Sequence, residues 1–197
     1  MRRLRVLFTL ALALVILVGF VVAQKKTALS DAQYIARACS AAPKEVSMDA
    51  AVVRPDESGK MTNLRTGKNG FTCMAIGSES MCADANSMAF FDAWSKHQPP
   101  PDKLGLTYML RGDEGASNTD PYATEKTADN HWIVTGPHIM IVGAASKTLG
   151  LPSTPDADPT KPYMMWAGTP YEHAMIPVGP SGSAPKVPSG KADPAKQ

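Results

Sequence analysis

Proline limits how long any regular element of this chain can be. The 197 residues include 17 prolines, and many of them stand at the ends of short apolar runs. Proline has no backbone N–H and is excluded from helix interiors and central strands, so each run must end near its proline. The runs that remain fit two short helices and several short strands. We therefore expect an α+β domain with a mostly antiparallel sheet, two helices and long loops.

The two predicted helices have recognisable ends. The first covers residues 29–43, where Ser30 or Asp31 can cap the N-terminus and a proline follows. The second covers residues 84–101, where Asp84 or Asn86 can cap the N-terminus and three consecutive prolines end the segment. Ser and Asp side chains accept hydrogen bonds from the free N–H groups of a first helical turn. Both segments are therefore expected to be helical.

Strands are predicted in the remaining apolar runs. These runs are "MDAAVVRP", "MTNLRTGKNGFTCMAIG" with an Asn69–Gly70 turn, "GLTYML", "HWIV", "HIMIV" and "YMMWAGTPYEHAMIPV". Asn-Gly is a strong turn signal between strands. "HWIV" and "HIMIV" flank a Thr-Gly-Pro turn, which predicts a hairpin with Ile139 and Ile141 facing the core. The polar stretch 111–130 is unusually long for a simple connection, and such loops are often functional.

The N-terminal segment resembles a secretory leader. Arg2, Arg3 and Arg5 precede an apolar run over residues 6–22, and Val21 and Ala23 place small residues before a cut. These features predict a signal peptide over residues 1–23 and a periplasmic or secreted protein. The alternative is an inner-membrane anchor formed by residues 6–22. Residues 24–178 would then form a single domain. Residues 179–197, rich in Gly, Pro, Ser and Lys, form a tail that is expected to be disordered.

Charge excludes some partners. Without residues 1–23 the chain has 17 basic and 18 acidic residues. A near-neutral chain lacks the basic surface that nucleic acids attract, so no nucleic-acid partner is expected. After the leader is removed, the sequence contains no cluster of basic residues that would indicate membrane binding. Any other partner stays open.

The three cysteines predict one disulfide. Cys73 and Cys82 lie close together in sequence, and an exported protein meets an oxidising compartment, so we expect a Cys73–Cys82 disulfide. Cys39 is left over and is expected to be a small buried thiol.

Three segments of the sequence are similar to a group of exported bacterial proteins of unknown function. They are "NGFTCMA", "SNTDPYATEKTADNHWIVTGPHIMIVG" and "MMWAGTPYEHAMIPV". The resemblance covers roughly residues 40–178 and implies export and a single domain. It implies no catalytic residue.

The tripeptide His-x-Met occurs twice, at His138–Met140 and at His173–Met175. Side chains alternate along a strand, so each histidine shares a face with its methionine. If the two strands are neighbours, two imidazoles and two thioethers converge, a ligand set that suits Cu(I). Three further residues nearby can add a thioether or an aromatic cap over the cation: Met164, Met165 and Trp166. The competing interpretation is core packing, because methionine commonly fills irregular cores.

A second group is polar and suggests acid–base chemistry. His131 stands two residues after Asp129, and Glu172 adjoins His173. A histidine oriented by a carboxylate is the arrangement of a general base. Glu172 and His173 are adjacent and would point to opposite strand faces, and the group also fits a solvated loop edge.

The sequence has no standard catalytic motif, such as G-x-S-x-G, H-E-x-x-H, C-x-x-C or a P-loop. The leading hypothesis is an exported, non-catalytic protein that binds a small molecule or a soft metal. One alternative is a hydrolase-like enzyme that uses a His–carboxylate pair. The other is a structural envelope protein whose histidines only pack.

Overall fold

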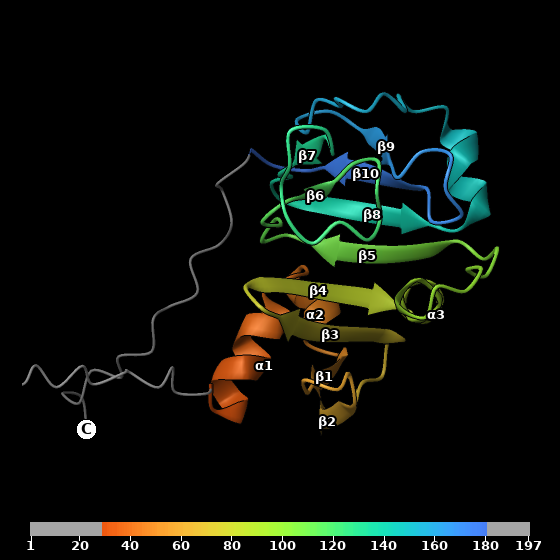
Figure 1. Cartoon of the computed structure of the whole chain (residues 1–197). Coiled ribbons are helices and arrows are strands. Elements are labelled where there is room, and N and C mark those ends of the chain that lie inside the picture. Colours follow the sequence, from red (N-terminus) through yellow and green to blue (C-terminus); the bar gives the residue numbers. More distant parts are fainter. Residues whose placement is uncertain (1–28, 181–197) are drawn as a thin grey trace, which may run out of the picture.

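One mixed sheet of eight strands organises the protein (Figure 1). The computed structural model describes residues 29–180, so the predicted leader and nearly all of the predicted tail lie outside the described residues. Within that range the chain forms a sheet-rich α+β fold, as the sequence predicts. The strand order is β2-β1-β3-β4-β5-β8-β10-β9. The strands are β1 (Ala51–Pro55), β2 (Met61–Arg65), β3 (Phe71–Ile76), β4 (Glu79–Asp84), β5 (Gly105–Met109), β8 (His138–Val142), β9 (Tyr163–Met165) and β10 (His173–Pro177).

Neighbouring strands pair antiparallel except for β1 and β3, which run parallel. The predicted strand–turn–strand order around Asn69–Gly70 is present, but β2 and β3 do not pair with each other. Both flank β1 instead. Asn69 ties this turn to the preceding helical segment, because its amide donates to the Val46 carbonyl. After the turn, β3 pairs with the edge of β1 opposite to the edge that pairs with β2.

Helix α1 (Asp31–Cys39) covers one face of the sheet at β3 and β4. Ser30 caps it as predicted, and Gln33 completes a capping box with the Ser30 backbone. The short helix α2 (Lys44–Ser47) follows at once. No helix within residues 29–180 is both long and apolar enough to cross a membrane.

The disulfide Cys73–Cys82 joins β3 to β4 under α1, which confirms the predicted pairing. The two cysteines are direct cross-strand partners. Disulfides of this kind persist in oxidising compartments, such as those that exported proteins reach. Cys39 is free and half-buried, and it lies against the Arg65 guanidinium.

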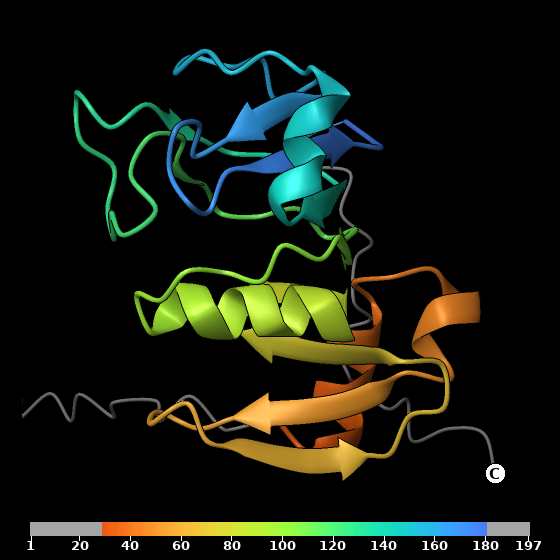
Figure 2. The same cartoon turned by 90° about the vertical axis from the view of Figure 1, so that its right-hand side faces the viewer.

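Helix α3 (Ala85–Ser95) packs on the opposite face of the sheet and lies across the front of Figure 2. Its cap, Asp84, accepts from the Ser87 N–H with one oxygen and from the Leu106 N–H with the other. Gly105 lets the helix approach β5 closely, since a Cβ there would lie 2.5 Å from the Ser87 nitrogen. The helix is thereby fixed over β4 and β5.

The predicted hairpin around Thr135–Gly136–Pro137 is not formed. The short strand β7 (Trp132–Ile133) pairs with β6 (Ala116–Ser117) in a separate two-stranded sheet, and β8 lies between β5 and β10. The Thr135 backbone is bonded to Asp113 instead, which separates β7 from β8. The prediction that Ile139 and Ile141 face the core is also wrong. The buried residues of β8 are His138, Met140 and Val142, and the two isoleucines are half-buried.

Candidate functional site

The two His-x-Met segments lie on adjacent strands and share one face of the sheet. β8 and β10 pair antiparallel, with Met140 directly opposite Met175. The two histidines are almost inaccessible to solvent: His138 and His173 are each 1 % exposed. The strand adjacency that the sequence could only assume is therefore present.

A cavity of about 320 Å³ lies against this face. Helix α3 and the long segment 111–130 form its other walls, and Figure 1 shows that segment crossing in front of β8 and β10. His138, His173, Met140 and Met175 all line it. Further side chains complete the lining, among them Met81, Met109, Met165, Phe91, Trp94 and Trp166.

Each histidine is oriented by the backbone in the same way. The Nδ1 of His138 lies 2.7 Å from the Gly136 carbonyl oxygen, and the Nδ1 of His173 lies 2.9 Å from the Tyr171 carbonyl oxygen. A carbonyl oxygen only accepts hydrogen bonds, so Nδ1 carries the proton in both rings. The Nε2 atoms of the neutral rings are then lone-pair acceptors. In metal sites, a hydrogen bond of this type from the nitrogen that does not bind the metal fixes the tautomer and orientation of the histidine.

Neither Nε2 atom has a hydrogen-bond partner among the described residues. Burial lowers the pKa of His138 to about 4, against the opposing effect of its bond to Gly136. Burial also lowers the pKa of His173 to about 4, and the nearby His138 adds to the shift. Both rings are therefore neutral at pH 7. A buried acceptor without a partner costs about 1–3 kcal/mol, which a ligand at Nε2 would relieve.

The two histidines lie on either side of the Met140–Met175 pair along the paired strands. The two histidines are offset by four residues in this register, or about 13 Å along the backbone. The two thioethers occupy the interval between them.

Each of the two histidines has a methionine as a cross-strand partner. Met109 is the cross-strand partner of His138, and Met165 is the partner of His173. The Trp166 ring adjoins His173, with ring centroids 4.9 Å apart. Residues 29–180 contain no group of three or more His, Cys, Asp or Glu side chains that could hold a metal. Any metal at this face would therefore depend on sulfur ligands.

Carboxylates stand at the edge of the cavity. Asp113 accepts from the Thr135 and Gly115 N–H groups, and Glu79 accepts from the Glu114 N–H. Burial raises the pKa of Asp113 to about 7, and the nearby Glu79 contributes to the shift. Both side chains line the cavity and hold the segment that covers it.

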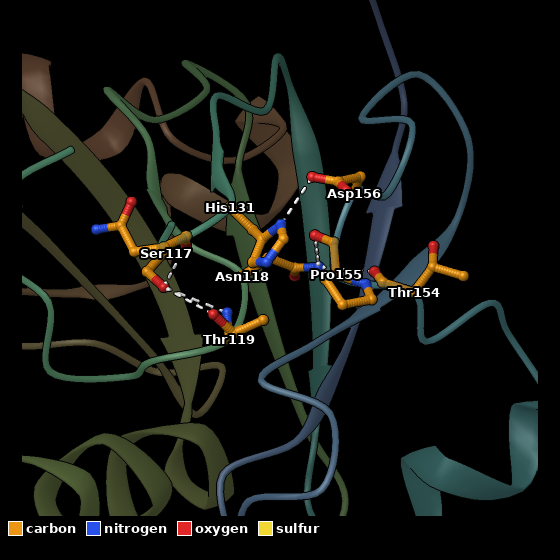
Figure 3. Close-up of polar contacts among 8 residues, drawn as sticks. Ser117, Asn118, Thr119, His131, Thr154, Pro155 and Asp156 are labelled. Atoms are coloured by element: carbon orange, nitrogen blue, oxygen red, sulfur yellow. Dashed lines mark hydrogen bonds and ion pairs between the residues drawn. The ribbon is translucent and has the colours of Figure 1, made fainter. Parts of the chain in front are cut away.

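The predicted His–carboxylate pairs are not formed. Because β7 starts at Trp132, His131 lies outside the strand, with a left-handed φ of 48°, and does not share a face with Asp129. Its Nδ1 lies 2.8 Å from Asp156 instead (Figure 3). Glu172 accepts from the Gly168 N–H and pairs with Lys147. The three predicted catalytic residues are therefore not brought together.

The His131–Asp156 pair is solvent-exposed, at 34 % for the histidine side chain and 85 % for the aspartate. Asn118 positions the chain that carries Asp156 by donating to the carbonyls of Thr154 and Pro155 (Figure 3). Exposed pairs of this type are worth little energetically. The pair lies outside the cavity that holds His138 and His173.

Sequence reasoning missed part of the site. Met109 and Met81 are brought in by β5 and β4, far from the His-x-Met segments in sequence. The alternation of "GLTYML" places Met109 on the same face as Thr107, but nothing in that segment indicates its neighbour on β8. Of the predicted additional residues, Met165 and Trp166 line the cavity and Met164 does not.

Comparisons of the chain with known protein families, with characterised proteins and with solved structures find no match.

Proposed function

We propose that this protein binds one monovalent copper ion, Cu(I), in the cavity between β8, β10 and α3. The ligands are the Sδ atoms of Met140 and Met175 and the Nε2 atom of His138 or of His173, because the two histidines are about 13 Å apart along the strands and one ion cannot bind both rings. The observation that carries the proposal is the pair of buried imidazoles. Each is held at Nδ1 by a backbone carbonyl, has an unpaired Nε2 and lines the cavity.

The donor set selects the metal. Thioether sulfur is a soft ligand and imidazole accompanies it in sites for Cu(I). Zinc sites are built from Cys, His, Asp and Glu, and the described residues gather no such group of three. These features support copper in its reduced state.

The proposal predicts tight and specific binding of Cu(I). The purified protein is titrated with Cu(I) under anaerobic conditions against a chromophoric Cu(I) chelator, and Zn(II) is tested in parallel. We expect one Cu(I) per chain and a much weaker response to Zn(II). At a hundredfold excess of metal over the dissociation constant, the free energy of unfolding should rise by about 2.7 kcal/mol.

Variants distinguish the histidines of the proposed site from the other histidines. His138→Ala/His173→Ala should weaken Cu(I) binding by at least about 10- to 100-fold, the loss expected when a residue that orients a metal ligand is removed, and the two single variants identify which imidazole binds. His131→Ala and His97→Ala are matched controls, because both histidines lie outside the cavity. A wild-type protein that does not compete for Cu(I), or a double His138→Ala/His173→Ala variant that binds as tightly, would refute the proposal.

The cavity volume supports a second candidate, a small organic ligand. About 320 Å³ is within the range of small-molecule pockets and exceeds the space that a single ion needs. Such a ligand would donate hydrogen bonds to the two Nε2 atoms and pack against the methionines. A co-purified organic molecule that mass spectrometry detects after denaturation, and that Cu(I) does not displace from the folded protein, would favour this candidate.

A further inference from the structure

A column of aromatic rings runs from the proposed copper site to the protein surface. His173 contacts Trp166, with centroids 4.9 Å apart, and Trp166 stacks on Trp94 at 5.7 Å. Trp94 stacks on Tyr122 at 6.2 Å, and Tyr122 stacks on His97 at 4.0 Å. The column is therefore continuous from the inner wall of the cavity outward.

Exposure increases along the column. Trp166 is 8 % exposed, Trp94 is half-buried and Tyr122 is 38 % exposed. His97, at the outer end, is exposed. The inner rings line the cavity and the outer rings lie at the surface, so the column connects the two.

Hydrogen bonds hold the two indoles in place without using their faces. The Trp166 N–H donates to the Ser117 carbonyl at 2.9 Å, and the Trp94 N–H donates to the Pro121 carbonyl at 3.1 Å. Trp166 and His97 also have left-handed φ angles of 56° and 55°. His97 directly follows the C-cap of α3, a position where a left-handed residue commonly ends a helix.

We propose that the column carries single electrons from copper in the cavity to an acceptor at the Tyr122 surface. This inference rests on the proposed copper site. An oxidised electron-transfer protein contacts Tyr122 and takes one electron from Cu(I), which becomes Cu(II). The electron tunnels through the adjacent rings, which couple copper to the acceptor and are not themselves oxidised. The acceptor gains one electron and no proton moves.

The test follows oxidation of the Cu(I)-loaded protein by hexacyanoferrate(III) in a stopped-flow instrument, with Cu(II) quantified by electron paramagnetic resonance. Trp94→Leu removes a ring from the middle of the column, and it should slow oxidation by at least about tenfold. Tyr122→Leu removes the outer ring, which does not line the cavity, and should also slow it. Trp132→Phe is the matched control, since Trp132 stands outside the column, and its rate should equal that of the wild type.

Cu(I) affinity and thermal stability are measured for every variant beside the rate. Variants that bind Cu(I) normally yet are oxidised as fast as the wild type would overturn the electron path and leave the copper site intact. Equal slowing in Trp132→Phe would also overturn it, because the effect would not depend on the column. A wild-type protein that binds no Cu(I) would overturn both proposals.

Discussion

Mild acid should destabilise the metal-free protein through its two cavity histidines. Burial holds the pKa of His138 and of His173 near 4, against an ordinary value of 6.5. Between these two values the unfolded chain binds a proton that the folded chain does not, so the free energy of unfolding falls as pH falls. The stability is fully present above pH 6.5 and is lost progressively toward pH 4.

The size of the effect follows from the two pKa values. Lowering the pH from 7 to 5 should remove about 2 kcal/mol of unfolding free energy for each histidine. Asp113 acts in the opposite direction. Its pKa is raised from 3.8 to about 7, so its folded carboxyl gains a proton over the same range and adds about 2 kcal/mol. The net loss in the wild type is therefore about 2 kcal/mol.

Variants isolate the histidine contribution. Urea unfolding at pH 7 and pH 5 is compared for the wild type and for His173→Phe, which keeps a ring of similar size but does not titrate. The variant should lose about 2 kcal/mol less than the wild type on acidification, and Asp113→Asn should lose more. If His173→Phe and the wild type showed the same pH dependence, His173 would not be neutral and buried as the site requires.

Three further changes test how the fold positions the site. Asp84→Ala removes a carboxylate that caps α3 and binds β5, and should lower the free energy of unfolding by about 1–2 kcal/mol, measured by chemical denaturation. Replacing both Cys73 and Cys82 by serine should cost about 2–3 kcal/mol, since the disulfide closes a loop with a sequence separation of 9; a stability equal to that of the oxidised wild type would contradict this. Gly105→Ala forces a Cβ to within 2.5 Å of the Ser87 nitrogen and should cost about 1–3 kcal/mol; an unchanged melting temperature would show that α3 can move away.

Local signals predicted the elements well. Ser30 and Asp84 cap the two main helices, and the strand-like runs form strands, because capping and proline placement act over a few residues. The Cys73–Cys82 disulfide followed from sequence proximity. The pairing of His138 with Met140 on one face followed from strand alternation.

Strand order was harder to predict, because it depends on contacts between distant segments. β8 inserts between β5 and β10, and this insertion replaces the predicted hairpin and brings Met109 beside His138. The predicted inward face of β8 was wrong for the same reason. A central strand is covered on both faces, so apolar character alone does not distinguish Ile139 from His138. The partner of His131 was also unpredictable, since Asp156 reaches it from a separate loop.

The most direct test of the copper site is X-ray absorption spectroscopy at the copper edge on the Cu(I)-loaded protein. We predict mixed nitrogen and sulfur ligands, with the nitrogen component reduced in a His138→Ala/His173→Ala variant and unchanged in His131→Ala. The sulfur component should fall in a Met140→Leu/Met175→Leu variant. A shell of only nitrogen and oxygen in the wild type, or one that none of these variants alters, would contradict binding between β8 and β10.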